Sequence, residues 1–437
     1  MNSCIACPGP APRLTLSNTA TTAASVVTAM TFSASGAAPT PLYPQYQESF
    51  GLLPFMVTLV FAAYVLSLLA ALLTVGSLSD HVGRRPAILA ALLLNIAAMV
   101  MFMTADSALT LIAARSVQGF ATGLAAATLG AAILDTDRRR GPVLNSVTAF
   151  AGLTVGSLGA GVLVTFAPFP DQLVYLALLM LSAIELLVLW HMPETARPKP
   201  GALASLRPHV SVPARARGPL ARLMPLTIAS WALGGFYFSL MPSLVRVATG
   251  LTLPVVGGLV VSALTFSATL TVLALRAVPA HRLFGGSIAA LASGVALTLA
   301  GVQAQLVSLM LAGAIVSGSG LGAALSATLR TVLPLAGNDE RAGLLSAFYV
   351  EGYLSFSLPA MLAGSLVPVI GLTAATDIYG LAVIATALAS APVIMLRPSL
   401  VSPATTRSPA CGTPGPGTSA RTRRRGTPSS RRHHVAG

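Results

Sequence analysis

The sequence predicts an all-α polytopic membrane protein, with twelve transmembrane helices in two pseudo-symmetric halves of six. Of its 437 residues, 54% are hydrophobic and only 9% are charged, whereas a soluble domain carries about 25% charged residues. The apolar residues form separate runs of the length that a bilayer requires, about 20 residues each. Because no soluble fold could bury this much apolar surface, we expect a lipid bilayer to surround much of it.

The net charge of +14 is spread unevenly along the chain. Of the 26 Lys and Arg residues, only Arg115 and Arg246 lie outside the termini and every second loop. An excess of basic residues marks cytoplasmic loops. This pattern predicts that both termini are cytoplasmic, and it argues against nucleic acid as a partner. Short outer loops and the lack of a glycosylation sequon fit a bacterial inner membrane, that is, the plasma membrane.

The first half is expected over residues 19–195, after a Pro-rich segment at 1–18 that predicts disorder. The first apolar run is rich in Ser and Thr and stops at Pro39–Pro44, where Tyr43 is expected to be an interfacial aromatic residue. The six runs of this half begin near Thr19, Pro54, Pro86, Leu109, Leu144 and Leu173.

A basic, Pro-rich linker is expected at residues 196–222, followed by the second half at 223–397. The tail at 398–437 predicts disorder, and its arginines could either contact anionic lipid or remain solvated. A shift of 200 residues aligns the two halves in one register, as two copies of one ancestor would. The runs of the second half begin near Met224, Pro254, Leu283, Leu306, Leu344 and Thr373.

The connection between the second and third runs carries the strongest motif. It contains Gly76, Leu78, Asp80, Gly83, Arg84 and Arg85 at fixed spacing. This stretch resembles the loop between the second and third helices of the major facilitator superfamily, Gly-x-Leu-x-Asp-x-x-Gly-Arg-Arg. The resemblance implies a secondary transporter that works by alternating access, with this stretch as its gating loop. It also implies that Asp80 meets the start of the eleventh helix, just after Arg341. An ordinary basic cytoplasmic loop is the alternative.

In the fourth run, Arg115, Gln118, Gly119 and Gly123 share one helical face, which also resembles the superfamily. A guanidinium within the bilayer costs at least ~2.5–3.5 kcal/mol unless it faces protein or water. Arg115, Gln118 and Gly119 are therefore expected at an inward-facing cavity or coupling site. An arginine that snorkels to the outer interface is the alternative. Gly123 would permit close helix packing.

The fifth run contains Gly152, Gly156 and Gly161 in a pattern similar to the signature of proton-coupled antiporters in the superfamily. Ser157 stands in the place of the signature's proline, and Ala160 in the place of a glycine. These departures weaken the antiporter assignment, and packing of small residues explains the glycines equally well.

Only two acids, Glu185 and Glu351, lie well inside apolar runs, and the first run contains none. Glu351 falls on the eleventh helix, and we expect it to be the proton-coupling acid; a structural hydrogen bond between the halves is the competing interpretation. Glu185 falls on the sixth helix, which is peripheral in the superfamily, so a packing or interfacial role is expected for it. Glu185 is the next candidate if Glu351 does not titrate.

No phosphate-binding loop, dinucleotide pattern or clustered metal-ligand set is present. We therefore expect no enzyme activity, no cofactor and no metal. The favoured function is proton-coupled export of a small organic molecule, neutral, amphipathic or anionic, by a monomer. Uptake coupled to protons or another solute is one alternative, and a membrane sensor or structural protein that does not transport is another.

Overall fold

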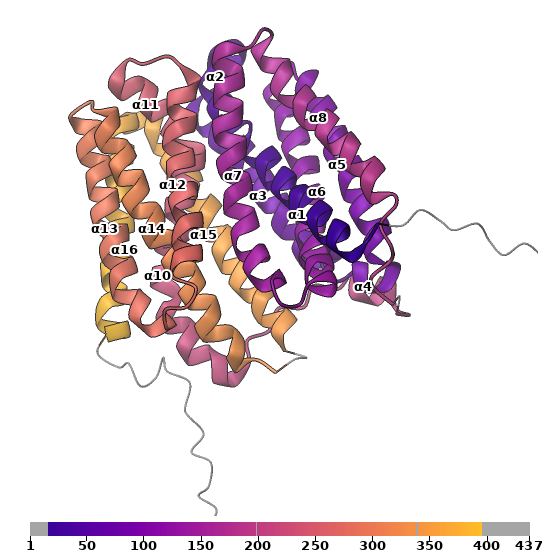
Figure 1. The fold of residues 1–437 in the computed structure, drawn as a ribbon. Coiled ribbons are helices and arrows are strands. Elements are labelled where there is room, and N and C mark those ends of the chain that lie inside the picture. The colour runs from indigo at the N-terminus through magenta and orange to yellow at the C-terminus, as the bar shows by residue number, and fades with distance from the viewer. Residues whose placement is uncertain (1–15, 198, 338–339, 396–437) are drawn as a thin grey trace, which may run out of the picture. The chain divides into compact units, whose positions relative to one another are not determined.

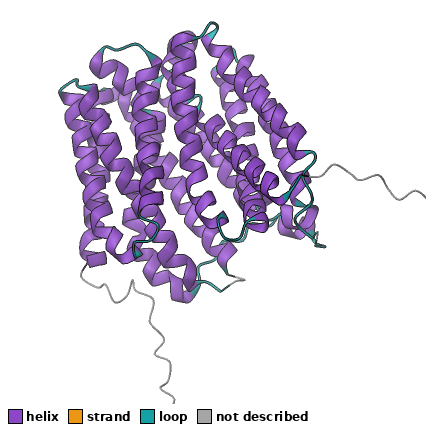
Figure 2. Ribbon diagram, in the orientation of Figure 1, coloured by secondary structure: helices purple, strands orange, loops and turns teal. Residues whose placement is uncertain are grey.

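The structure, a computed structural model, describes residues 16–197, 199–337 and 340–395 (Figure 1). Every regular element within these ranges is a helix (Figure 2). The disorder predicted for the N-terminal segment and for the C-terminal tail concerns residues that lie almost entirely outside the described ranges. The predicted all-α, multi-pass architecture is confirmed.

The first half contains six long helices and two short ones at its loops. The long helices are α1 (Asn18–Ala37), α3 (Pro54–Val75), α5 (Arg84–Met103), α6 (Ala108–Thr136), α7 (Gly141–Phe166) and α8 (Pro170–Leu189). The short ones are α2 (Tyr43–Phe50), preceded by the 3₁₀ turn η1 (Thr40–Leu42), and α4 (Ser79–Val82).

The second half repeats this order. Its long helices are α10 (Ala214–Ser239), α12 (Pro254–Ala274), α13 (Ala280–Gln303), α14 (Val307–Val332), α15 (Arg341–Ile370) and α16 (Leu372–Met395). Its short elements are α9 (Ala202–Ser205), α11 (Met241–Thr249) and η2 (Leu333–Leu335).

Ten of the described helices are long and apolar enough to span a membrane by themselves. The bent pair of α10 and α11, which meet at 60°, supplies an eleventh span. α1 completes the set of twelve, because its 20 residues would measure about 30 Å. Its many Ser and Thr residues lower its hydropathy. A membrane-spanning helix tolerates them here because most of them are buried against other helices.

Equivalent helices of the two halves have equivalent neighbours. α6 packs against α3 in the same way that α14 packs against α12. Glycines permit this approach at matching places: Gly119 and Gly123 against the backbone of Tyr64 and Leu68, and Gly318 and Gly322 against that of Leu264 and Ala268. Between the halves, α7 packs against α12, and α3 against α15 (Figure 1).

One local expectation is wrong. Tyr43 is not interfacial: the segment after Pro39 continues as η1 and α2, and the Tyr43 side chain is only 1% exposed. The segment expected as the linker, residues 196–222, contains α9 and the start of α10 at Ala214. Pro213 directly precedes that start, where a proline is compatible with helix initiation.

Candidate functional site

A large cavity lies between the two halves. Its volume is about 760 Å³, and it reaches the gating loop and residues 205–209. The lining comes from α1, α3, α6 and α7 of the first half, and from α10, α12, α14 and α15 of the second. This set contains the first and fourth long helices of each half; the resemblance to the major facilitator superfamily implies that helices one, four, seven and ten line the cavity. We call the end that carries these loops the basic end, and the end that carries α2 and α11 the opposite end (Figure 1).

The cavity combines an aromatic interior with charges at its mouth. Trp231 of α10 and Phe348, Tyr349 and Tyr353 of α15 line it, and we call these four residues the aromatic wall. The Trp231 and Tyr353 rings lie 5.1 Å apart, centroid to centroid, and those of Tyr349 and Tyr353 6.0 Å apart. The charged residues of the described lining belong to the basic end: Asp80, Arg84, Arg207 and Arg330.

At the opposite end, the two short helices hold the halves together. Ser243 of α11 donates a hydrogen bond to the Gln47 side chain of α2, over 2.9 Å. Arg246 of α11 forms an ion pair with Glu48 of α2. In this conformation the cavity therefore reaches the basic end, while α2 and α11 are in contact at the opposite end.

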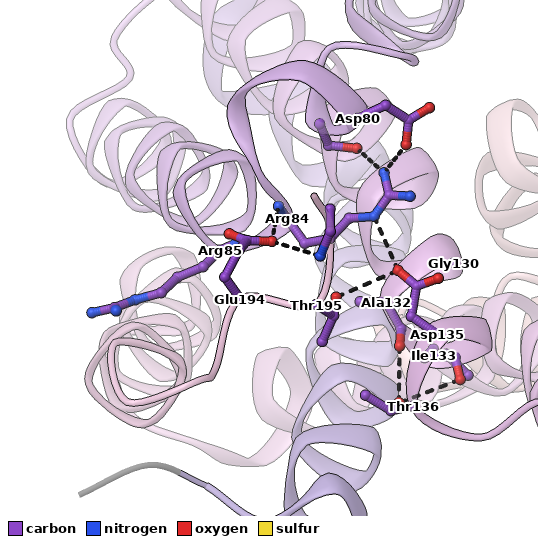
Figure 3. A network of polar contacts seen from close by, with 12 residues as sticks. Asp80, Arg84, Arg85, Gly130, Ala132, Ile133, Asp135, Thr136, Glu194 and Thr195 are labelled. Atoms are coloured by element: carbon purple, nitrogen blue, oxygen red, sulfur yellow. Dashed lines mark hydrogen bonds and ion pairs between the residues drawn. The ribbon is translucent and has the colours of Figure 1, made fainter. Parts of the chain in front are cut away.

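The gating loop is organised around Arg84 (Figure 3). Its guanidinium pairs with Asp80 at 2.5 Å and with Asp135 of α6 at 3.3 Å, and it donates to the Ser79 hydroxyl at 2.6 Å. Because Asp80, Arg84 and Asp135 come from the gating loop, α5 and α6, the network ties three neighbouring elements of the first half together. Arg85 points away from it and lies over the Trp190 ring.

Glu194 caps the start of α5 (Figure 3). Its carboxylate accepts hydrogen bonds from the main-chain amides of Arg84 at 2.7 Å and Arg85 at 3.2 Å. An anion is favourable at a helix N-terminus, where the first amides lack partners. Gly83 turns the chain into this cap with φ +104°, a backbone conformation that suits glycine, and a side chain there would collide with Glu194.

Asp80 does not reach the start of α15 in this conformation, which differs from what the family resemblance implies. Among the described residues its carboxylate pairs with Arg84, while its carbonyl oxygen accepts from the Lys199 amide at 3.3 Å. The segment that follows Lys199 lies next to the start of α15, where the Ser211 amide donates to the Gly343 carbonyl oxygen. The residues between Lys199 and Ser211 thus link the gating loop to the start of α15.

The start of α15 is held by its own half. Arg215 of α10 forms an ion pair of 2.6 Å with Glu340, which directly precedes α15. The Arg215 side chain and the Gly337 amide hold the pKa of this carboxyl group below its ordinary value. This end of α15 is therefore fixed to α10.

Arg115 lies in the interior and not at an interface, with 1% of its surface exposed. It donates to the Gly36 carbonyl oxygen at 2.9 Å, to the Gln118 side chain at 2.7 Å and to the Tyr43 hydroxyl. Its guanidinium also lies 4.9 Å from the centre of the Tyr64 ring. Among the described residues no acid pairs with it. Its charge is instead compensated by the carbonyl end of α1 and by aromatic faces.

Gln118 continues this cluster by donating to the Ser35 carbonyl oxygen at 2.8 Å. Neither Arg115, Gln118 nor Gly119 belongs to the described lining of the cavity. The structure thus brings Arg115 and Gln118 together, as their spacing predicts, at the end of α1 and not at the cavity surface. A small cavity residue, Thr122, follows one turn later on α6.

The glycines of α7 serve two different contacts. Gly152 and Gly156 lie against the backbone of α1 at Met30 and Ala34. Gly161 lies against α12 at Val255, across the boundary between the halves. All three positions therefore have a packing role here, and Gly161 is the one of the three at an interface that would change if the halves moved.

The two membrane acids occupy different surroundings. Glu351 accepts a hydrogen bond from Thr227 of α10 at 2.9 Å. It lies two residues from both Tyr349 and Tyr353, which places it on the opposite side of α15 from these cavity residues. Glu185 is 6% exposed and accepts from Thr31 of α1 at 2.6 Å.

Several residues of this site could be identified from the sequence only in part or not at all. Glu194 follows the sixth run directly, and its position could have indicated a capping role; Tyr43 and Tyr64 are ordinary aromatic residues of apolar runs. The aromatic wall could be anticipated only in part, because the repeat of aromatic residues between 348 and 356 says nothing about which face meets the cavity.

Comparisons with known proteins agree with this architecture. The chain is similar to multidrug resistance protein MdtL of Escherichia coli O9:H4 (strain HS), with 30% identity over 150 residues. That match covers 33% of this chain and 38% of the MdtL chain, so it spans well under half of either protein. MdtL of Shigella flexneri matches equally well.

The fold is similar to that of a crystal structure of the nucleoside transporter NupG (D323A mutant). The TM-score is 0.66 at 14% identity, covering 86% of this chain and 99% of that one. The sequence model of the Major Facilitator Superfamily matches residues 24–358, which is most of the chain. The protein therefore belongs to the major facilitator superfamily, a family of membrane transporters and not of enzymes.

Proposed function

We propose that this protein exports a small neutral or anionic amphipathic molecule across the plasma membrane by alternating access, in exchange for protons, and that it acts as a monomer. The main observation in support is the cavity of about 760 Å³, which both halves line and which reaches the basic end. With the basic end in the cytoplasm, as the positive-inside pattern predicts, the described conformation is open to the compartment from which an exporter loads.

The lining supports the proposed substrate class. The aromatic wall offers apolar and π surfaces, which suit an amphipathic molecule with rings. The mouth carries the arginines Arg84, Arg207 and Arg330 against one acid, Asp80, so it is electropositive. Such a mouth favours neutral or anionic ligands over dications. The similarity to MdtL over part of the chain supports export.

The test is transport by inside-out vesicles with an imposed pH gradient, acid inside. The probes are fluorescent amphipathic dyes of neutral, anionic and cationic charge, together with metabolites chosen by a growth screen of a deletion strain. Accumulation of a neutral or anionic probe driven by the gradient is expected, with Asp80→Asn vesicles as the inactive control. Depletion would indicate uptake instead, and no gradient-driven flux for any probe would favour a protein that has lost transport.

A further inference from the structure

A buried polar row runs along one face of α1. Thr21, Ser25, Thr28 and Ser35 follow each other at intervals of four, three and seven residues, and each is completely buried. Within this row Thr28 lies next to Glu185 of α8, and Ser35 accepts a hydrogen bond from Asn95 of α5. None of the four belongs to the described lining of the cavity, which α1 contacts through Ala29, Phe32 and Ser33. Among the described residues the hydroxyls of Thr21, Ser25 and Thr28 have no hydrogen-bond partner. Hydroxyls in a helix usually bond to the preceding turn or to a neighbour, so such a row is unusual.

Glu185 of α8 lies beside this row. One carboxylate oxygen accepts from Thr31 at 2.6 Å, Thr28 lies next to it, and the other oxygen has no partner among the described residues. The carboxyl group is on the face of α8 that meets α1. An acid inside a membrane domain without a partner of opposite charge is a candidate functional group.

Few charges can compensate Glu185. Of the helices packed against α8, α1 and α7 carry no charged residue, and α5 carries only Arg84 and Arg85 at its first turn. Arg84 is paired with Asp80 and Asp135, and Arg85 lies over Trp190. On α8 itself the other titratable groups are Asp171 and Tyr175, more than two turns away. A buried carboxylate without a cation nearby is unfavourable. Binding of a proton would remove this uncompensated charge.

A separate set of hydrogen bonds starts one turn before Glu185 and leads to the other end of α1. Ser182, one turn before Glu185, accepts from Asn95 of α5 at 3.0 Å, and Asn95 also donates to Ser35 at 3.4 Å. Ser35 in turn is bonded through its carbonyl oxygen to Gln118, the partner of Arg115. Polar groups thus follow α1 from Thr21 near the basic end to Arg115 near α2.

We propose that Glu185, with the hydroxyl row of α1, is the proton-binding site whose occupancy sets the position of α1. This rests on the proposed function, and it names the coupling residue of that transport cycle. The proton adds to the carboxylate and leaves from the same group, with no other bond made or broken. A neutral Glu185 can donate to a hydroxyl of α1 where the ionised group can only accept, so the bonding between α8 and α1 changes with protonation.

The first test uses infrared difference spectroscopy on the full chain in lipid nanodiscs, titrated with acid and without any transported molecule. A C=O band of a protonated carboxyl group that rises on acidification is expected in the wild type. It should be lost in Glu185→Gln and kept in Glu351→Gln, the competing acid, and in Asp377→Asn, a matched loss of an acid on α16. A band that is lost in Glu351→Gln and kept in Glu185→Gln overturns the proposal.

The second test follows the opposite end with spin labels at Ser49→Cys and Leu251→Cys, after replacement of Cys4, Cys7 and Cys411. Acidification should change the relative populations within the distance distribution several-fold. Glu185→Gln should abolish this response, and Glu185→Asp should retain it. A pH response that persists in Glu185→Gln, or a response to Na⁺ at constant pH, overturns the proposal. Gradient-driven transport that survives Glu185→Gln refutes the inference alone, whereas a proton response without any transport refutes the proposed function alone.

Discussion

The Arg115 guanidinium on α6 donates a hydrogen bond to the main-chain carbonyl oxygen of Gly36, at the last turn of α1, over 2.9 Å. The last carbonyl groups of a helix have no partner within the helix and carry partial negative charge. Arg115 supplies both a donor and a cation at that place, and it also bonds to Tyr43, just beyond the end of α1. One side chain thus links the last turn of α1 to Tyr43, the first residue of α2.

We expect Arg115→Lys to lose most transport activity and Arg115→Ala to lose more. A lysine cannot serve three separate acceptors with a planar fork or stack on Tyr64. A hydrogen bond to a charged group contributes about 1.5–3 kcal/mol, so the melting temperature in detergent should fall as well. The measurements are gradient-driven flux at equal abundance and thermal unfolding, with Arg246→Lys as the control. Transport near the wild-type level in Arg115→Lys would contradict the assigned role.

Asp80→Asn should insert normally and lose transport. The substitution removes the 2.5 Å ion pair with Arg84 and the anion that could meet the start of α15 when the basic end closes. A helix N-terminus attracts an anion by ~0.3–1 kcal/mol, up to about 2 when partly buried. That energy is comparable to the difference between two conformers. Flux is compared at equal membrane abundance with Asp137→Asn, an acid in the next loop of the same end; equal flux in both variants would refute the prediction.

Gly156→Val should destabilise the protein, whereas Gly159→Ala on the same helix should not. A side chain at Gly156 would collide with the backbone of α1 at Ala34, while the space around Gly159 is open. Overpacking of a close contact costs about 1–3 kcal/mol. The melting temperature of each variant in nanodiscs measures the difference. If both variants unfold at the wild-type temperature, α7 and α1 do not pack as described.

Neutralising the pair at the opposite end should shift the conformational equilibrium modestly. Arg246 and Glu48 are partly exposed, and exposed ion pairs contribute about 0.2–1 kcal/mol. Glu48→Gln should therefore favour separation of α2 and α11 by a factor of less than about five, from the same energies. Spin-label distances between these helices measure it, and Glu48→Arg combined with Arg246→Glu should restore the wild-type distribution. Failure of the reversed pair to restore it would show that the contact does not depend on charge.

The sequence was sufficient for the membrane class, the positions of the long helices and the gating-loop motif. These features depend on local composition: an apolar run of about 20 residues crosses a bilayer whatever it packs against, and basic loops orient the chain. The breakers at Pro54 and Pro254 mark helix starts that the structure confirms to the residue. The Ser- and Thr-rich first run was assigned to the membrane although its composition is the least apolar of the first half.

Only the tertiary structure decided which face of each helix meets which neighbour. It places Glu351 outside the described cavity lining, buries Glu185 against α1, moves Tyr43 from the expected interface into the core, and lets Glu194 cap α5. In lipid, nearly every face of a helix is apolar, so hydrophobic periodicity gives little indication of the buried side. The partners of buried polar groups are instead set by residues far apart in the chain, because helices pack through small residues and hydrogen bonds whose counterparts lie on other helices.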